Sequence, residues 1–348
     1  AEHHHTHWIA DQSIDFLSER DRTRPFFLWS SFIKPHPPFE NPTPWNKLYR
    51  ASEMLPPFRP EGYENLLNFW NRLQNRYKYR DAGIDDQLMR TIRAAYYAAI
   101  SFIDYNVGRI LDALGDEIDN TLILFSADHG ELLGDYGSVG KRVMLDAAAR
   151  VPMLARYPRE CAAGKRVDAP TSLLDIWPTA LTAAGNESIC HPARQLRAQI
   201  YSSGEGEALQ RVADGSSARK VVYSQFSEGR YGLYMVTDGR HKYIYSAADE
   251  KEWLFDRQRD VDEQHNFAYN PSYHAETTRL RSTLIERFQA DGYDIAVHDG
   301  TWRRYGEQAL PDDPDFGLLF QDPPGTQEAI DALGPYARPA TVSHAAAY

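Results

Sequence analysis

The chain has 348 residues, of which 42% are hydrophobic and 12% aromatic, and its 49 acidic and 38 basic side chains give a net charge of −11. This length fits one large or two modest domains, and the apolar content suffices for a buried core, which argues against a disordered protein. No apolar run approaches the ~18 residues of a membrane-spanning helix, and the acidic balance argues against nucleic-acid binding. Neither of the two cysteines belongs to a CxxC pair, which excludes a disulfide scaffold and a cysteine-ligated zinc site.

The first part of the chain predicts a helix, a strand and a long loop. Apolar residues at helical spacing occupy positions 8–17, and an uninterrupted apolar run at 26–33 predicts a buried, parallel strand. The segment 34–60 is rich in proline, which removes backbone donors and predicts an irregular loop. Loops of this size inside compact domains are usually functional.

The next part continues the alternation of helices and strands. Apolar side chains three and four positions apart predict a helix over 86–114. Strands are predicted at 121–126 and 151–156, and a helix at 173–184. This alternation predicts an α/β fold for residues 1–215, with a mostly parallel sheet sandwiched by helices.

Beyond residue 215 the pattern changes to short strands. Segments 221–226, 232–237 and 241–245 are separated by turn residues such as Asp238-Gly239, which predicts an antiparallel sheet. A helix is predicted at 275–290. We assign residues 216–295 to a smaller C-terminal α+β subdomain and residues 296–348, rich in Pro and Asp, to a surface tail.

Two adjacent metal-ligating residues follow the strand 121–126. The carboxyl ends of strands line the active-site crevice of open α/β sheets, and Asp128 and His129 lie at this position. A carboxylate oxygen and an imidazole nitrogen are both ligands of divalent cations. The alternative is that Asp128 caps a helix and His129 is an ordinary surface residue.

A second candidate site follows the strand predicted at 26–33. In Lys34-Pro35-His36-Pro37 the prolines restrict the backbone around both functional side chains. Such an arrangement suits an oxyanion contact by Lys34 and general-acid catalysis by His36. The alternative is a proline-rich turn with a solvated lysine and a hydrogen-bonded histidine.

Lys141 is the third candidate. Gly140-Lys141 resembles part of a phosphate-binding loop, but GxxxxGK[ST] requires glycine where Asp135 stands and Ser or Thr where Arg142 stands. The sequence therefore excludes a P-loop nucleotide triphosphatase.

Together these segments resemble the sulfatase family of the alkaline-phosphatase superfamily. The matching pieces are similar to the family's Lys-Pro-His-x-Pro-Phe loop, the helix before the metal strand, the metal-site signature, the following lysine, the Arg-Val-Pro strand, the Asp-x-x-Pro-Thr helix and two strands of the C-terminal sheet. In chain order they are residues 34–39, 94–108, 126–137, 141, 150–154, 174–179, 239–243 and 254–256.

The resemblance assigns a role to each candidate. It implies that Asp128 and His129 are two ligands of a divalent cation, for which the family favours Ca²⁺. It implies that Lys141 bridges the sulfate and the nucleophile, that His36 helps to protonate the leaving oxygen, and that Lys34 lines the substrate side. These roles agree with the chemistry, because a sulfate ester places charge on its oxygens in the transition state.

The sequence also departs from the family. The family's nucleophile is a formylglycine made from Cys or Ser in a C/S-x-P-x-R motif. We expect no such motif in residues 1–348, because Cys161 lacks the Pro-x-Arg pattern, and the early Asp-Asp metal pair is not found. We therefore expect the chain to lack the N-terminal part that carries the nucleophile, and to be incomplete and inactive alone. Tyr136 stands where the family often has His.

The resemblance leaves three functions open. The first is a sulfatase acting on a sulfated small molecule or a sulfated polysaccharide. The second is a phosphonate monoester hydrolase or phosphodiesterase of the same superfamily, and the third is an inactive binding module. We expect specificity to depend on the segment 37–85 and on the tail. The family is often secreted or periplasmic, but this sequence itself indicates neither a compartment nor an oligomeric state.

Overall fold

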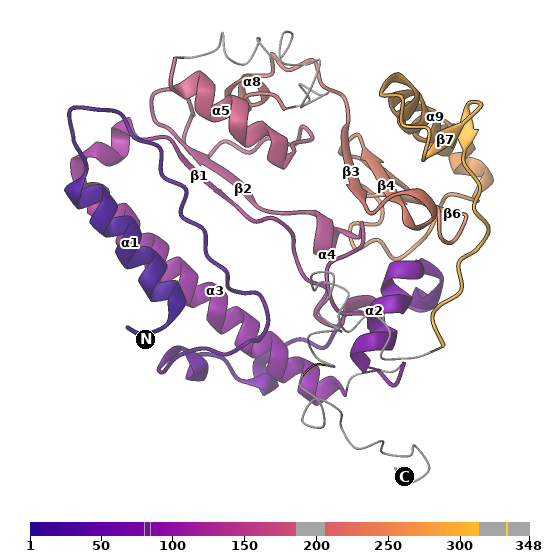
Figure 1. The fold of residues 1–348 in the computed structure, drawn as a ribbon, viewed down its shortest axis with the longest axis horizontal. Coiled ribbons are helices and arrows are strands. Elements are labelled where there is room, and N and C mark those ends of the chain that lie inside the picture. Colours follow the sequence, from indigo (N-terminus) through magenta and orange to yellow (C-terminus); the bar gives the residue numbers. More distant parts are fainter. Residues whose placement is uncertain (80, 84, 186–205, 313–331, 333–348) are drawn as a thin grey trace.

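The structure is a computed structural model that describes residues 1–79, 81–83, 85–185, 206–312 and 332 (Figure 1). Most of the segment assigned to the surface tail, from 313 onward, lies outside the described residues. In the described part, no helix has both the length and the apolar character needed to cross a bilayer.

Two long helices form one side of the molecule. Helix α1 (His5–Glu19) packs along α3 (Asp86–Leu114), as Figure 1 shows. Helix α3 begins where Asp85 accepts hydrogen bonds from the backbone N–H groups of Gln87 and Leu88, because a carboxylate at this position satisfies donors that have no partner within the helix. Both predicted helices are therefore confirmed.

The segment 26–33 does not form the predicted buried strand. It runs as extended chain without the pairing of a strand, and every second side chain faces solvent. Phe27, Trp29 and Ile33 are 68%, 65% and 66% exposed. The prediction was wrong because an apolar run gives its segment an extended conformation but does not decide whether a neighbouring strand covers it.

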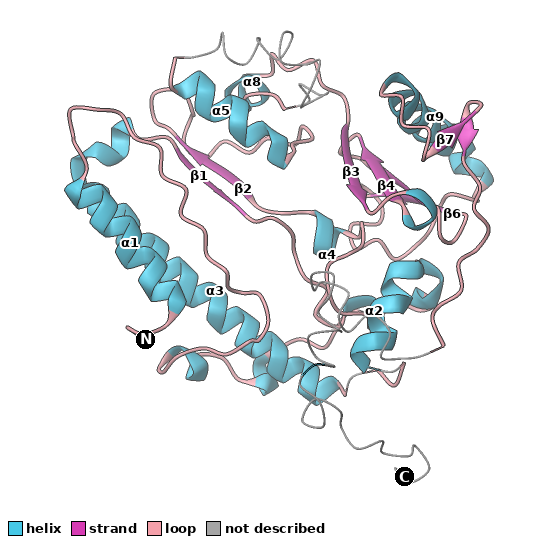
Figure 2. Cartoon of the chain, in the orientation of Figure 1, coloured by secondary structure: helices cyan, strands magenta, loops and turns pink. Residues whose placement is uncertain are grey.

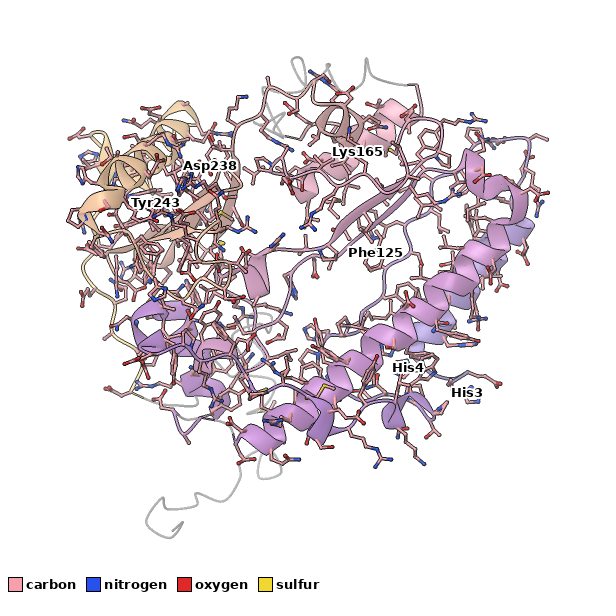
Figure 3. All side chains as sticks on the ribbon, turned by 180° about the vertical axis from the view of Figure 1, so that it is seen from behind. His3, His4, Phe125, Lys165, Asp238 and Tyr243 are labelled. Atoms are coloured by element: carbon pink, nitrogen blue, oxygen red, sulfur yellow. The ribbon has the colours of Figure 1, made fainter. Side chains whose placement is uncertain are left out.

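Two short strands follow α3. Strand β1 (Ile123–Ser126) pairs with β2 (Met153–Arg156), with Ser126 opposite Met153. Their positions agree with the prediction, but this pair is antiparallel, whereas a parallel arrangement was expected. Phe125, labelled in Figure 3, is 41% exposed.

Short helical turns lie in and just after the proline-rich segment, and a helix that was not predicted follows them. The turns are Trp45–Lys47, Ala51–Glu53 and Tyr63–Leu66. They lead into α2 (Phe69–Tyr79).

The C-terminal part is an antiparallel sheet with a helix, as predicted (Figure 2). Its order is β3-β4-β5-β6, and α9 packs against β4 and β5. The bounds are Val222–Phe226 for β3, Leu233–Thr237 for β4, His241–Ser246 for β5, Lys251–Asp256 for β6 and His274–Ala290 for α9. Within the described ranges, the remaining α-helices and strands are α4 (Asp146–Ala149), α5 (Ile176–Ala183), α8 (Leu209–Asp214), β7 (Val297–His298) and β8 (Thr301–Trp302).

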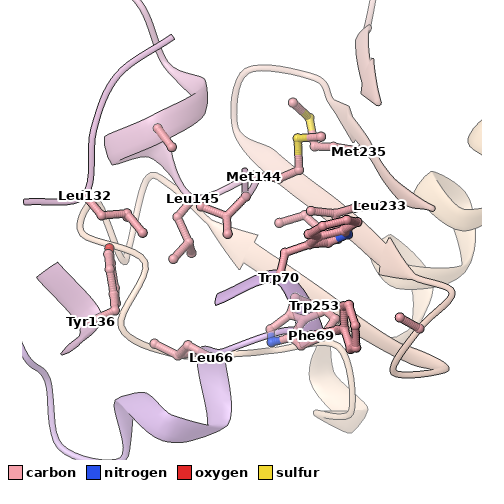
Figure 4. Packing of buried hydrophobic residues seen from close by; sticks show 14 of the residues in the cluster. Leu66, Phe69, Trp70, Leu132, Tyr136, Met144, Leu145, Leu233, Met235 and Trp253 are labelled. Atoms are coloured by element: carbon pink, nitrogen blue, oxygen red, sulfur yellow. The ribbon is translucent and has the colours of Figure 1, made fainter. Parts of the chain in front are cut away.

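The two faces of this sheet belong to different hydrophobic clusters. Tyr234 and Val236 pack with α9, whereas Leu233 and Met235 point to the other face, as the two-residue period of a strand requires. That other face packs on Trp70 of α2 and on residues that follow β1 (Figure 4). One hydrophobic cluster therefore crosses residue 215, where the sequence suggested a boundary.

Candidate active site

The turn after β1 lies close against the chain that precedes β2. The backbone N–H of Gly130 donates to the Ala148 carbonyl at 2.7 Å, and the Ser126 hydroxyl donates to the Pro152 carbonyl at 2.8 Å. A Cβ at position 130 would lie 2.1 Å from the Ala147 carbonyl oxygen. Only glycine allows this approach of two backbone segments, so the turn is anchored directly beside the two candidate ligands.

Asp128 and His129 point toward one another. Nε2 of His129 lies 3.1 Å from Oδ2 of Asp128, and the other carboxylate oxygen accepts the backbone N–H of His129 at 2.9 Å. Nδ1 of His129 lies 2.8 Å from the Gly130 carbonyl. Because a carbonyl can only accept, Nδ1 must be the donor, and the neutral ring then carries its lone pair on Nε2.

This arrangement fits two ligands of a cation. A lone pair on Nε2 of His129 and a carboxylate oxygen of Asp128 repel one another unless a proton or a cation lies between them. The Asp128 side chain is 82% exposed, so its oxygen is accessible from solvent. Across the described ranges, no group of three or more His, Cys, Asp or Glu side chains has metal-binding geometry. This part of the chain therefore offers two ligands.

The loop between residues 130 and 141 folds back on itself. Leu132 N–H donates to the Gly140 carbonyl at 3.0 Å, and Gly140 N–H donates to the Glu131 carboxylate. Gly140 has a φ of 95°, a conformation that residues other than glycine rarely adopt. The loop thereby returns Lys141 to the turn that carries Asp128.

Lys141 is half-buried among charged groups. Burial lowers the pKa of the Lys141 ammonium, and the nearby carboxylates of Glu131 and Asp128 oppose that shift. Lys141 and Asp128 therefore act on each other electrostatically. A cation at the Asp128 carboxylate would leave the ammonium available for an anionic substrate group.

Lys78 of α2 joins this cluster and was not among the predicted residues. A Cβ at Gly140 would lie 3.0 Å from the Lys78 ammonium nitrogen. Loss of hydration lowers the pKa of Lys78, Glu131 opposes this shift, and Lys141 is among the cations that favour it. The helical spacing of Phe69, Trp70, Leu73 and Tyr77 was the signal that could have revealed α2.

The loop that carries Lys34 and His36 is held by the lysine itself. The Lys34 side chain is 3% exposed, and its ammonium lies 2.7 Å from the Glu40 carboxylate and donates to the Pro38 carbonyl. In this arrangement the ammonium binds its own loop. His36 is exposed, and its Nδ1 lies 2.7 Å from the Pro37 carbonyl, so Nδ1 donates and Nε2 faces away from that bond.

Helix α3 lies between this loop and the turn that carries Asp128 and His129. The Asn41 amide donates to the Ala95 carbonyl at 2.8 Å, and the Phe39 ring packs edge-on to Tyr96 at 6.0 Å. Burial raises the pKa of Tyr96, and the carboxylates of Glu131 and Asp128 raise it further. The same turn of α3 therefore contacts the 34–41 loop and lies in the electrostatic field of Asp128.

Tyr136 has a structural role in this arrangement. Its backbone N–H donates to the Phe58 carbonyl at 2.7 Å, and its hydroxyl donates to the Asp262 carbonyl at 2.6 Å. The ring lies in the hydrophobic cluster of Figure 4. Where the sequence departs from the histidine that the family often has, the structure therefore places a core residue.

The expectation that residues 1–348 contain no C/S-x-P-x-R motif is wrong. Cys161 lacks the C/S-x-P-x-R pattern, but Cys190-His191-Pro192-Ala193-Arg194 has that form. This segment follows the Asp128 turn in the chain, whereas the resemblance places the nucleophile before it. It lies outside the described residues.

Family models match most of the chain. The model described as Sulfatase matches residues 2–186, and the model described as N-sulphoglucosamine sulphohydrolase, C-terminal, matches residues 134–290. An arylsulfatase of Clostridium perfringens is 28% identical over 305 residues, which cover 83% of this chain and 59% of the relative. A choline-sulfatase of Rhizobium meliloti is 29% identical and covers 86% of this chain and 58% of the relative. The chain thus spans about three fifths of the length of these relatives.

One solved structure has a similar fold over most of this chain. The phosphonate monoester hydrolase from Silicibacter pomeroyi superimposes with a TM-score of 0.69 at 27% identity, covering 88% of this chain and 65% of that chain. The likeness confirms the predicted fold class, an alkaline-phosphatase-like α/β fold with a smaller C-terminal antiparallel sheet and helix.

Proposed function

Because this chain belongs to the sulfatase family, we propose that it contributes part of the active site of a sulfuric-ester hydrolase. The observation that carries the proposal is the turn at Asp128 and His129, with Lys141 folded back beside it. The carboxylate and the imidazole face one another at 3.1 Å, and burial lowers the pKa of Lys141 while the negative charge of Asp128 opposes that shift. In this proposal the cation site and the Lys141 ammonium are close to one another, so both can bind the oxygens of one sulfate group.

Asp128 and His129 hold a divalent cation, most suitably Ca²⁺, in this proposal. When bound, the cation polarises the sulfate and stabilises the charge that develops on its oxygens. His129 keeps its proton on Nδ1, because that atom donates to the Gly130 carbonyl at 2.8 Å. Its Nε2 is therefore kept as a ligand without a further proton transfer.

Lys141 and His36 act on the substrate in this scheme. Lys141 donates to a sulfate oxygen and to the nucleophile. Burial disfavours its ammonium in the free protein, so a bound anion stabilises the charged form of Lys141. His36 carries a proton on Nε2 and donates it to the leaving oxygen, while Nδ1 remains bonded to the Pro37 carbonyl. Lys34 reaches a substrate anion only when its ammonium exchanges Glu40 for that anion.

The nucleophile in this proposal is a formylglycine. We expect it in a part of the fold that comes ahead of the Asp128 turn, as the resemblance implies, and the Cys190 pattern is the alternative within residues 1–348. Mass spectrometry of the peptide that contains Cys190 separates the two, because conversion of the thiol to an aldehyde changes its mass. An unconverted Cys190 supports a nucleophile elsewhere, and an aldehyde there refutes it.

A phosphonate monoester hydrolase is the second candidate. The fold likeness to such an enzyme at 27% identity favours it specifically. Both reactions use a cation and an ammonium against a tetrahedral oxyanion, so the described residues serve either. Turnover of an aryl sulfate and of a phosphonate monoester by the intact protein decides between them, and faster phosphonate hydrolysis refutes the sulfatase proposal. An intact protein that hydrolyses neither supports an inactive binding module.

The substrate class is a sulfated small molecule or sulfated polysaccharide. A shallow groove beside the 34–41 loop is lined by Phe39, Glu40, Asn41, Tyr49 and residues of α3. Its amide and aromatic side chains are groups that can bind a sugar ring or an aryl ring. Replacing Tyr49 with Ala is expected to raise KM more for a sulfated oligosaccharide than for a small aryl sulfate if this groove binds the rest of the substrate.

A further inference from the structure

A lysine of the C-terminal sheet reaches the chain that follows Lys141. Lys242 lies on β5, and its side chain is 2% exposed. Its ammonium donates to the Met144 carbonyl at 2.7 Å and to the Asp146 carboxylate at 2.7 Å. Met144 and Asp146 stand three and five residues after Lys141. A side chain from one part of the fold thus binds both a backbone group and a side chain of the segment behind the candidate active site.

Glu263 also contacts Lys242 and Asp146. It is fully buried, pairs with the Lys242 ammonium, and accepts the backbone N–H of Asp146 at 2.7 Å. Its backbone has a φ of 52°, which is unfavourable for a residue other than glycine. Arg257 adds an ion pair with Asp146 at 2.9 Å. The cluster therefore holds the first residue of α4 through its amide and its carboxylate.

Helix α4 transmits this contact to the candidate metal ligands. It is one turn long, and it contains Ala148, whose carbonyl accepts the Gly130 N–H at 2.7 Å. Gly130 directly follows His129 in the chain. Continuous contacts thus run from Lys242 through α4 to the turn that carries Asp128 and His129.

Stability alone does not require this arrangement. Burying charges costs hydration energy that an ion pair only partly returns, and apolar residues of similar size can often replace such a pair without loss of stability. The ammonium of Lys242 does something that an apolar side chain cannot do, because it donates to the Met144 carbonyl and to Asp146 in a defined direction.

We propose that Lys242, together with Glu263, is a positioning residue of the active site. The pair fixes residues 144–148, and these hold Gly130 and thereby the orientation of Asp128 and His129. The inference rests on the proposed function for the role of that turn. The small C-terminal sheet then acts on the active site through residues 144–148.

The test is the double variant Lys242→Met and Glu263→Gln. It removes the ammonium and the negative charge of the buried carboxylate. The amide oxygen of the new glutamine can still accept the backbone N–H of Asp146. Amide exchange of Gly130 is followed by NMR, and Ca²⁺ binding by isothermal titration calorimetry. We expect the Gly130 amide to lose protection and the Kd for Ca²⁺ to rise about 10–100-fold, the range found when groups that orient metal ligands are removed. Should the double variant fail to fold, Glu263→Gln alone is expected to move both readouts in the same direction.

The matched control is Arg281→Met on α9. This change also removes an ion pair of the C-terminal subdomain, because Arg281 binds both oxygens of Glu252 at 2.6 Å. It is expected to lower stability without changing Gly130 exchange or Ca²⁺ affinity. A folded double variant with the wild-type Gly130 exchange rate and the wild-type Ca²⁺ affinity overturns the inference. If the wild-type protein binds no Ca²⁺, the proposed metal role fails, whereas Gly130 exchange still decides the positioning role.

Discussion

Gly130→Ala tests the contact that anchors the candidate ligands. The φ of Gly130 lies outside the left-handed region, so alanine can adopt its backbone conformation, and the effect of the substitution comes from its methyl group alone. That methyl would lie 2.1 Å from the Ala147 carbonyl oxygen and 3.1 Å from its carbon. Because both atoms belong to the backbone, the turn itself must move.

The expected loss has two parts. Forcing an extra methyl into a packed site costs about 1–3 kcal/mol, and losing the hydrogen bond from Gly130 to the Ala148 carbonyl costs about 1 kcal/mol. Urea denaturation followed by circular dichroism should therefore show a free energy of unfolding lower by about 2–4 kcal/mol. Calcium affinity should fall as well, because Asp128 and His129 move with the turn.

Gly108→Ala is the matched control. Gly108 lies inside α3, and a Cβ at that position would meet no atom within 4 Å. The same substitution there should stabilise the protein by about 0.5–1 kcal/mol, because alanine loses less conformational freedom in a helix. A Gly130→Ala variant as stable as the wild type, with unchanged Ca²⁺ affinity, would refute the reasoning about this turn.

Three further predictions concern catalysis, acid stability and the electrostatics of the site. In the intact protein, His36→Ala and Lys141→Ala should each lower turnover of an aryl sulfate about 10²–10³-fold, because each removes a transition-state contact; a loss below about threefold in either removes that residue from the site. Burial opposes ionisation of Asp256, but its ion pair with Arg240 lowers the pKa of Asp256 to about 2. The ionised Asp256 contributes fully to the free energy of unfolding above its ordinary pKa of 3.8, and this contribution disappears as the pH falls toward 2. Between pH 4 and pH 2, the free energy of unfolding of Asp256→Asn should therefore fall by about 1–2 kcal/mol less than that of the wild type. An unchanged pH dependence between 4 and 2 would contradict this assignment. Lys78→Met should raise the pKa of Lys141 because it removes a neighbouring positive charge. NMR titration of the Lys141 side chain measures this pKa, and an unchanged value in the variant would contradict the prediction.

Local patterns predicted many of the individual elements. The three-and-four spacing of apolar residues located α3 to its observed ends, because a helix that packs on one side needs such a stripe. Turn residues located the hairpins of the C-terminal sheet, since tight antiparallel connections need specific backbone conformations. Asp128 and His129 became candidate ligands because they directly follow a strand.

The strand expected at 26–33 shows the limit of this reasoning. A run of apolar residues favours an extended chain, but the pairing of that chain depends on segments far away in the sequence. In the structure, Phe27 and Trp29 stay largely exposed. Helix α2 was missed for a different reason, because its few apolar residues alternate with polar and charged ones and it follows the proline-rich loop in the chain.

The sequence by itself determined the family, most of the helices and strands, and the identity of the residues that form the turn after β1. All of these depend on neighbours in the chain. Only the tertiary structure decided that Lys34 binds Glu40, that Lys78 approaches Gly140, and that Lys242 holds the segment before β2. The direction of a long charged side chain depends on which partners surround its end, and those partners come together only when distant segments pack.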